Sequence, residues 1–225
     1  MSQAEPKNAQ NDPRADDQPS DPRRRRTRQA IIRAGQTLFG QHHPDGVSTD
    51  ELIRAAKVSK QSFYNHFVDK DDLAHEILRM TRAEIDALVD EVNVGQTDPA
   101  KRLASALCVY ARHALLNPEQ GQLIARLPFD DIAVESDTNS RVVSDLNEGL
   151  LQGRLAIFTL ETGVAFVIAT AQALINRVLG APQPTLAVVT GQQFVTLVLR
   201  AFGLAPIEAE LIASEAANRI IRLPA

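Results

Sequence analysis

The chain has 225 residues, with 24 Lys and Arg against 28 Asp and Glu, so its formal net charge is -4. This length suits one large or two small domains with a sizeable core. The content of 44% hydrophobic and 23% charged residues is that of an ordinary globular protein. Cys108 is the only cysteine, which excludes an intramolecular disulfide and argues against a cysteine-based zinc or iron–sulfur site. We therefore expect no metal site and no cofactor.

The charges are unevenly distributed along the chain. Residues 1–21 carry a net charge of -3, residues 22–70 carry ten basic and four acidic side chains, and residues 71–225 carry a net charge of -7. The basic middle segment is compatible with a nucleic-acid partner although the whole chain is acidic. On charge alone, a solvated basic face is the alternative.

Residues 1–20 are polar and contain prolines, a composition typical of disorder. They include no apolar segment of the kind found in an export signal. The most apolar run without a charge or a proline covers residues 162–176, which is shorter than the roughly 20 residues that a membrane-spanning helix needs. We therefore expect a cytoplasmic protein that does not contact a membrane.

The first predicted helix extends from Pro22 to Phe39. Asp21 is suited to be its N-cap, and Pro22 to be its first helical residue. Arginines at positions 23–26 and 28 lie in its first turns, where they either contact phosphates or remain solvated. Apolar residues at spacings of three and four mark its buried face: Ile31, Ile32, Gly35, Leu38 and Phe39.

Three further helix starts follow a predicted loop at residues 40–47. Ser48 and Glu51 have the spacing of a capping box, which begins a short second helix. Ser59 can cap a third helix that extends to about Phe67, and Asp69 can cap the fourth. The buried stripe of the fourth helix is predicted to consist of Leu73, Ile77, Ile85, Leu88 and Val92.

Every later segment is also predicted to be helical, with prolines and glycines at the breaks. The later helices are expected at residues 99–116, 119–127, 138–152, 161–180, 185–203 and 206–221. The fold is therefore predicted to be all-α. We divide it into a disordered tail at residues 1–20, a three-helix helix-turn-helix domain at residues 21–68 and a helical domain at residues 69–225.

The third helix is predicted to have one apolar and one polar side. At 100° per residue, Phe63 and Phe67 share a side, and Gln61 and Asn65 point almost directly away from it. A helix that enters the major groove of DNA needs a compact polar face of this kind, although any amphipathic surface helix has a polar outside. Three residues complete the face: Lys60 at its tip, with Ser62 and Tyr64 beside it.

A set of residues between positions 31 and 73 has a family-specific order and spacing. These residues are Ile31, Ala34, Leu38, Phe39, Ser48, Thr49, Leu52, Ala55, Ala56, Val58, Ser59, Phe63, Tyr64, His66, Phe67, Lys70 and Leu73. Residues 31–73 thereby resemble, without a gap, the DNA-binding domain of the TetR family of bacterial transcriptional regulators. The most specific part is the Tyr-x-His-Phe-x-x-Lys string that begins at Tyr64.

The resemblance implies a homodimer that binds a pseudo-palindromic operator in double-stranded DNA. It also implies release of the operator when a small-molecule effector enters the C-terminal domain. Roles carry over by position. The expected phosphate contacts are Ser48, Thr49, Tyr64, His66 and Lys70, and the expected base contacts are Gln61 with Lys60 and Ser62, with Asn65 on the same exposed face.

The sequence departs from the family pattern at two places. Lys57 stands in the turn before the third helix, where the family usually has a glycine because that residue often needs a positive φ. His43 and Pro44 stand where the family usually has a glycine and an aromatic residue. Lys57 is therefore expected either to adopt a strained conformation or to alter the turn, and in both cases it adds positive charge near the DNA.

Two late helices, at residues 161–180 and 185–203, are expected to form the dimer interface that the resemblance implies. They carry few charges, and Ala165, Ala169 and Ala173 recur every four residues, which allows helices to approach closely. A helix-turn-helix unit usually needs a partner to span two half-sites. The alternative is that both helices are buried in the core of the monomer.

A ligand pocket is expected among the helices at residues 99–116, 119–127, 138–152 and 161–180. Each candidate residue also has an ordinary core or surface role as its alternative, and a buried inert thiol is the alternative to redox sensing by the cysteine. The candidates are Cys108, Tyr110, Arg112, His113, Phe129, Phe158, Phe166 and Gln172. The adjacent His42 and His43 lack the carboxylate or cysteine neighbours that a metal site would need.

The leading hypothesis is a DNA-binding transcriptional regulator, specifically a ligand-responsive repressor. We do not expect an enzyme, because the chain has no Gly-rich phosphate loop, His-Glu-x-x-His motif or Gly-x-Ser-x-Gly motif. The alternative is a helical interaction protein whose basic segment binds DNA non-specifically or binds another partner.

Overall fold

The computed structural model describes residues 22–126, 134, 136 and 139–222, and within these residues the chain is helical and contains no strand. The predicted all-α fold is thereby confirmed. The elements are α1 (Pro22–Gln41), η1 (Pro44–Gly46), α2 (Thr49–Ala56), α3 (Lys60–Tyr64), α4 (Lys70–Val92), α5 (Pro99–Leu116), α6 (Pro118–Arg126), α7 (Ser140–Leu151), α8 (Leu160–Gly180), α9 (Pro184–Ala201) and α10 (Pro206–Ile220).

Local capping chemistry determines where the N-terminal helices begin. Ser48 accepts a hydrogen bond from the backbone N–H of Glu51, whose side chain accepts one from the backbone N–H of Ser48, so the predicted capping box is present. Ser59 caps α3, and Asp69 caps α4 through the N–H groups of residues 71 and 72. The expected cap of α1, Asp21, lies outside the described residues.

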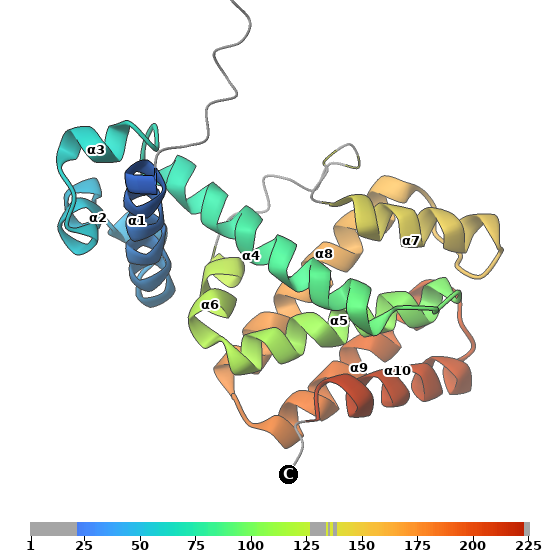
Figure 1. Cartoon of the computed structure of the whole chain (residues 1–225). Helices are drawn as coiled ribbons and strands as arrows, with labels where there is room; N and C mark the ends of the chain where they lie inside the picture. The colour runs from blue at the N-terminus through green and yellow to red at the C-terminus, as the bar shows by residue number, and fades with distance from the viewer. Residues whose placement is uncertain (1–21, 127–133, 135, 137–138, 223–225) are drawn as a thin grey trace, which may run out of the picture.

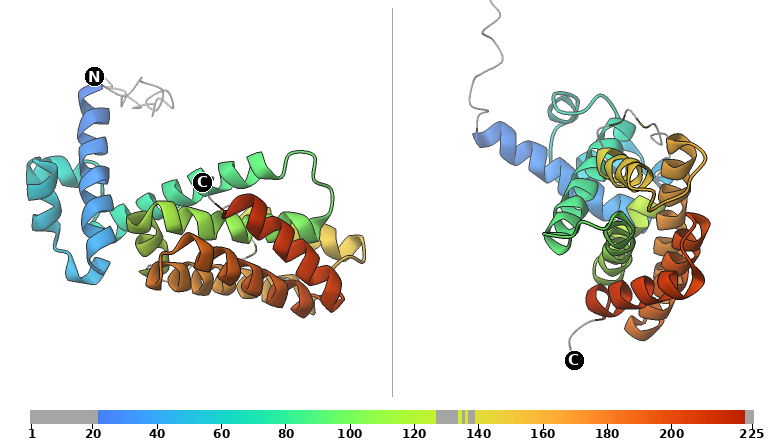
Figure 2. Two further views of the ribbon diagram at one scale, coloured as in Figure 1. Left: turned by 90° about the horizontal axis from the view of Figure 1, so that it is seen from below. Right: turned by 90° about the vertical axis from the view of Figure 1, so that its right-hand side faces the viewer.

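The helices enclose two hydrophobic cores, one at each end of an elongated molecule. A small core lies among α1, α2, α3 and the start of α4, and a larger core lies among α5, α7, α8, α9 and α10. Figures 1 and 2 show the first three helices set apart at one end, with α4 running from them along the larger bundle. The small domain is therefore held by α4 and α6, which both contact it.

The packing of α1 on α4 is close. A Cβ atom at Gly35 would lie 2.6 Å from the Cδ1 atom of Ile77, so the absence of a side chain allows the two helices to approach. Leu73, Ala74 and Ile77 on the first turns of α4 are buried in the small core, and Leu123 of α6 joins them. The small core thus extends beyond residue 68 into α4, the helix that also forms part of the large domain.

Three local features differ from the sequence prediction. The helix α3 has only five residues, and His66 and Phe67 lie in the turn that follows it. The loop at residues 40–47 contains the short helix η1. In α4, Leu88 was predicted to be buried but is 43% exposed, and its neighbour Val89 is buried instead. The buried residues of this helix follow one another at intervals of four: Ile77, Thr81, Ile85 and Val89.

Helix α8 begins one residue before its expected start, and it is apolar over more residues than the uncharged run at 162–176. Its 21 residues have a mean hydropathy of 1.5 in the most apolar window, which is long and apolar enough to cross a membrane by length and composition alone. The helix nevertheless packs against α5, α6, α7 and α9, and its buried residues include Val164, Leu174 and Ile175. A central helix of a bundle has the same composition, so this property does not by itself indicate a membrane protein.

Candidate functional site

The joint between α2 and α3 consists of three residues, and its first residue has an unusual backbone. Lys57 has φ 55° and ψ 42°, the left-handed conformation that favours glycine. Its N–H donates to the carbonyl oxygens of Ile53 and Arg54 and so closes α2. The turn therefore keeps its tight geometry despite the departure from glycine, and the exposed lysine side chain lies beside the start of α3.

The short helix α3 presents the predicted polar face. Phe63 is fully buried, with its ring 5.5 Å from that of Tyr64 and 6.1 Å from that of Phe67. Gln61 and Asn65 are exposed, and Tyr64 is 49% exposed. The predicted orientation of α3 is confirmed, and its outward side chains are hydrogen-bonding groups of the size that major-groove recognition uses.

The residues expected to contact phosphates are not equally available. The Ser48 hydroxyl and backbone N–H both lie 2.8 Å from the Glu51 carboxylate, and these hydrogen bonds lower the pKa of Glu51 below its usual value. Thr49, in the first turn of α2, and His66 are half-buried. Burial, and next the charges of nearby arginines, lower the pKa of His66, so its imidazole is neutral at pH 7.

Lys70 is held inside the small domain. Its ammonium donates to the carbonyl oxygens of Pro44, Asp45 and Val47 at 3.0, 3.2 and 3.2 Å. These bonds use all three of its N–H donors. The ammonium that was expected to contact a phosphate is therefore engaged within the small domain, where it joins the start of α4 to the loop that leads into α2.

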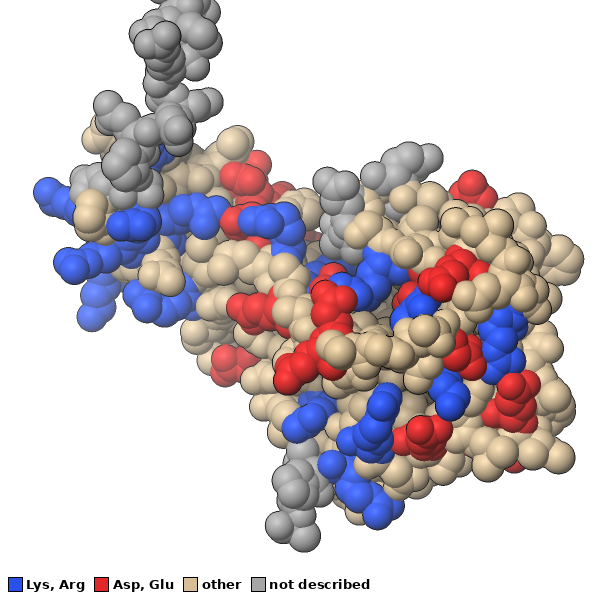
Figure 3. All heavy atoms as spheres, turned by 45° about the vertical axis from the view of Figure 1, so that its right-hand side comes forward, with Lys and Arg blue, Asp and Glu red and all other residues tan. Residues whose placement is uncertain are grey.

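Basic side chains gather over the small domain. In the view of Figure 3, Lys and Arg lie close together at this end of the molecule, whereas acidic and basic residues mix over the rest. The arginines of the first turn of α1, at positions 23–26, are all exposed. Arg28 differs from them, because it forms an ion pair with Glu76 and stacks over the ring of Phe67, 5.3 Å from its centroid.

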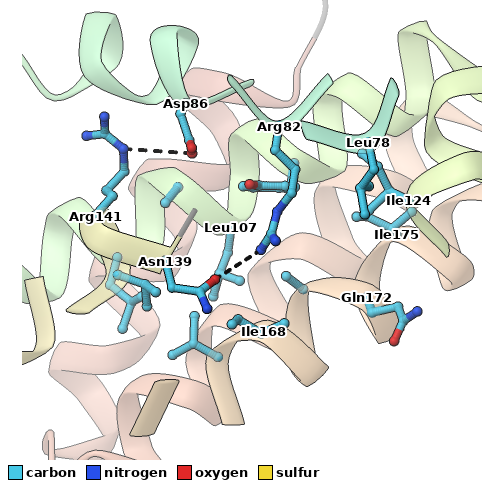
Figure 4. Close-up of a pocket in the computed structure, with 16 residues that line it drawn as sticks. Leu78, Arg82, Asp86, Leu107, Ile124, Asn139, Arg141, Ile168, Gln172 and Ile175 are labelled. Atoms are coloured by element: carbon cyan, nitrogen blue, oxygen red, sulfur yellow. Dashed lines mark hydrogen bonds and ion pairs between the residues drawn. The ribbon is translucent and has the colours of Figure 1, made fainter. Parts of the chain in front are cut away.

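A cavity of about 110 Å³ lies in the large domain, between α4, α5, α6, α7 and α8 (Figure 4). Its walls are mostly aliphatic, and polar side chains gather toward one part of it. A mostly apolar cavity with a few convergent polar groups is the usual form of a small-molecule site. The aliphatic lining consists of Leu78, Leu103, Ala106, Leu107, Ile124, Val142, Val167, Ile168, Ala171 and Ile175.

The polar part of the cavity joins α4 to α7. Arg82 donates to the Oδ1 atom of Asn139 at 3.3 Å, and Nε of Arg141 lies 3.8 Å from a carboxylate oxygen of Asp86. Burial raises the pKa of Asp86, and it raises the pKa of Tyr110 to about 12, with the nearby Asp86 charge adding to the shift. The Tyr110 hydroxyl is therefore protonated at neutral pH and can donate a hydrogen bond.

Only two of the residues predicted to form a ligand pocket line this cavity. These are Tyr110 and Gln172, and the Gln172 amide donates to the carbonyl of Ala125 at 2.9 Å. Five others lie outside the lining: Cys108, Arg112, His113, Phe158 and Phe166. Phe129 lies outside the described residues.

The positions of these five residues explain their absence from the cavity. Cys108 and His113 are buried elsewhere on α5, whereas Arg112 is exposed. Phe158 is fully exposed in the turn before α8, and Phe166 is on the outer face of α8, 5.7 Å from the ring of Phe202. Burial raises the pKa of Cys108 to about 12, so its thiol is protonated at neutral pH.

Sequence reasoning missed the polar lining residues other than Tyr110 and Gln172. Arg82 and Asp86 are four residues apart on α4, so their spacing placed them on one face, but the expected pocket included no part of that helix. Asn139 and Arg141 lie at the start of α7, and no local pattern relates them to α4. Among the residues that the structure describes, no three His, Cys, Asp or Glu side chains group as a metal site would require.

Helices α8 and α9 have outward faces with few charges. On α8 this face includes Phe166, Ala169 and Ala173, and on α9 it includes Val189 and Leu197, the latter 63% exposed. Both helices also have a buried side within the large core. Each helix therefore contributes to the core and leaves an apolar stripe on the surface.

Comparison with known proteins supports the family resemblance. Residues 31–77 match the model of the bacterial regulatory proteins of the tetR family. The chain is 26% identical over 103 residues to the HTH-type transcriptional regulator AcrR of Shigella flexneri, a match that covers 46% of this chain and 48% of AcrR. The chain thus spans about half the length of this curated relative.

Solved structures share the fold over most of their length. RolR in complex with resorcinol is 25% identical, with a TM-score of 0.61 over 85% of this chain and 95% of RolR. RolR without ligand has a TM-score of 0.68 over 83% of this chain and 96% of RolR. A tetR-family regulator from Shewanella sp. PV-4, 16% identical, has a TM-score of 0.67 over 80% of this chain and 99% of its own.

Proposed function

Because residues 31–77 identify this chain as a member of the TetR family of bacterial transcriptional regulators, we propose that it is a dimeric repressor of transcription. In this proposal the dimer binds a pseudo-palindromic operator and releases it when a small molecule occupies the cavity of the large domain. The observation that carries the proposal is the exposed polar face of α3, supported on Phe63 and joined to α2 by a three-residue turn.

We propose that α3 reads base edges in the major groove. Gln61 is exposed and can form a bidentate pair with an adenine edge, with Lys60 and Ser62 beside it and Asn65 on the same face. Phosphate contacts flank this face and position the helix. They come from Tyr64, from His66 and from the start of α2 at Ser48 and Thr49, where the first-turn N–H groups favour an anion.

The small domain of residues 21–68 is the DNA-binding unit in this proposal, and residues 69–225 form the regulatory and dimerisation unit. The first turns of α4 pack in the small core, so this helix links the two units. In this proposal, a shift of α4 at the cavity is transmitted through the small core to α3.

We propose that α8 and α9 form the dimer interface. Their outward stripes, with Phe166 and Ala169 on α8 and Leu197 on α9, are apolar and nearly free of charge. The small Ala169 and Ala173 allow close helix approach, as expected from their spacing. A dimer is what a helix-turn-helix protein needs to hold two recognition helices at the separation of two half-sites.

We propose a single-ring hydroxylated molecule as the effector. The cavity of about 110 Å³ is close to the size of an engineered cavity of about 150 Å³ that binds benzene. Arg82, Asp86 and Tyr110 provide donors and acceptors for a hydroxyl group at the polar part. The similarity to RolR, whose complex contains resorcinol, supports the same class of molecule.

The remaining parts of the proposal follow from this function. A regulator of this kind is not an enzyme, and it acts in the cytoplasm, where the DNA lies. A helical interaction protein with a non-specific basic segment is the competing function, favoured only by the net positive charge of residues 22–70.

Selection of bound sequences from a random duplex library, with the purified protein at moderate salt, tests the proposal. A two-fold symmetric motif is expected, because it requires both sequence reading and a dimer. Enrichment of no motif, with affinity falling equally for all duplexes as the salt concentration rises, would instead establish non-specific binding.

A further inference from the structure

A polar groove separates the first turns of α1 from α3 and the turn after it. Arg23, Arg24 and Thr27 line it from α1, and Ser62, Asn65 and His66 line it from the other side. The two sides are about 40 residues apart in the sequence, so only the tertiary structure brings them together. None of the six lining residues is acidic.

A neighbouring contact fixes the two sides of the groove relative to each other. Arg28, one helical turn after Arg24, stacks over the ring of Phe67 and pairs with Glu76 of α4. Because residues four apart lie on one helix face, the Arg24 side chain projects from the same face toward His66. The charge of Arg24 acts on His66, in agreement with this proximity.

The groove is chemically suited to an anion. Within the described part of the chain, no carboxylate forms an ion pair with Arg24, whereas Arg28 and Arg79 share the carboxylate of Glu76. The Asn65 amide and the Ser62 hydroxyl are hydrogen-bond donors on the opposite wall. Guanidinium and amide groups that converge in this way match the oxygens of a phosphate.

We propose that this groove binds a phosphate of the DNA backbone beside the major groove that receives α3, so that the start of α1 is part of the DNA-binding surface. The inference rests on the proposed function, since it places the duplex against α3. When Gln61 faces the bases, the groove, with His66 on one wall and Arg24 on the other, lies beside the sugar–phosphate strand on the α1 side. Arg24 then lies on the path of that strand and replaces the phosphate contact that the engaged Lys70 does not provide.

The test compares two arginines of the same run. Arg24 lines the groove, whereas Arg26 is exposed, does not line it and points about 200° away around the helix. The affinities of Arg24→Ala, Arg24→Lys and Arg26→Ala for the selected operator duplex are measured by fluorescence anisotropy over a series of salt concentrations. Circular dichroism checks that each variant is folded, and a scrambled duplex reports non-specific binding.

For Arg24→Ala, we expect the slope of log K against log salt to decrease by about 0.9 for each phosphate that the variant no longer neutralises, and so by twice that for a dimer. Arg24→Lys should recover most of the slope, and Arg26→Ala should change it little. If Arg24→Ala and Arg26→Ala changed the slope equally, the arginines would attract DNA diffusely and the proposed phosphate site would be wrong. A wild-type slope for Arg24→Ala would also contradict the proposed phosphate site. If the wild-type protein itself selects no operator, the proposed function fails, and that result is distinct from either outcome for the variants.

Discussion

The Nζ atom of Lys70 and the carbonyl oxygen of Pro44 are 3.0 Å apart, so the first residue of α4 holds the loop before α2 from 26 positions further along the chain. The same ammonium also reaches the carbonyls of Asp45 and Val47. The start of α2 and the start of α4 are thereby fixed relative to each other. We therefore expect Lys70 to support the proposed DNA-binding unit through the position of α2 rather than by contacting a phosphate.

Replacement of Lys70 by methionine is expected to destabilise the small domain. The change keeps the length of the side chain but leaves three carbonyl oxygens without their donor, which costs about 1.5–3 kcal/mol for a hydrogen-bonded charged group. Urea denaturation followed by circular dichroism measures the decrease in stability, with Lys60→Met as the control because Lys60 is exposed. If the Lys70→Met protein were as stable as the wild type and lost only salt-dependent affinity for DNA, that result would support a direct contact between Lys70 and a phosphate.

Gln61→Ala is expected to change specificity rather than overall affinity. A bidentate pair with a base is worth about 1–3 kcal/mol of discrimination, so the preference at one or two positions of each half-site should relax. Tyr64→Ala is the comparison, because removal of a phosphate-binding group weakens binding to all sequences alike. Repeating the duplex selection with both variants measures this, and a uniform decrease in affinity for Gln61→Ala would exclude its base-reading role.

Filling the cavity is expected to abolish the response to an effector without affecting operator binding. Ala171 lines the cavity from α8, so the larger side chain of Ala171→Leu occupies the space that a single ring requires. Resorcinol should raise the melting temperature of the wild-type protein, since a ligand that binds only the folded state stabilises it. It should not raise that of Ala171→Leu. An equal shift in melting temperature for both proteins would mean that resorcinol binds outside this cavity. The control is Ala205→Leu, which makes the same change at an exposed position.

Cys108 is expected to be inert to thiol reagents in the folded protein. Burial raises its pKa to about 12, and the thiolate is the reactive form. Titration with a chromogenic disulfide should therefore show no reaction in native buffer and one reactive thiol per chain in denaturant. Fast reaction in native buffer would mean that the large domain opens around α5.

His113 is expected to reduce stability at acidic pH. Burial lowers the pKa of His113 below 6.5. A hydrogen bond with Gln120 and the charge of Glu84 raise this pKa, but by less than burial lowers it. The unfolded chain then takes up a proton at a higher pH than the folded chain does, so stability decreases as the pH falls through and below 6.5. The melting temperature of His113→Gln should decrease less between pH 7 and pH 5 than that of the wild type, and parallel curves would contradict the assignment.

Local sequence determined the helices and the polar face of α3. Caps such as Ser48, Ser59 and Asp69 act within three residues, and the spacing of Phe63 and Phe67 orients α3. These interactions depend on neighbours in the chain, so they can be predicted without knowing the fold. The family resemblance also depends on residues within this one segment.

Tertiary structure alone decided which distant groups meet. Arg82 and Asn139 are 57 residues apart, and Arg24 and His66 lie on separate elements, so no spacing in the sequence relates them. The position of Lys70 in the motif predicted a phosphate contact. In the folded chain, the loop at Pro44 lies close to Lys70, and its carbonyl oxygens accept the hydrogen bonds of the ammonium. The faces of helices follow from periodicity, whereas the cavity, the groove and this lysine depend on how those helices pack against one another.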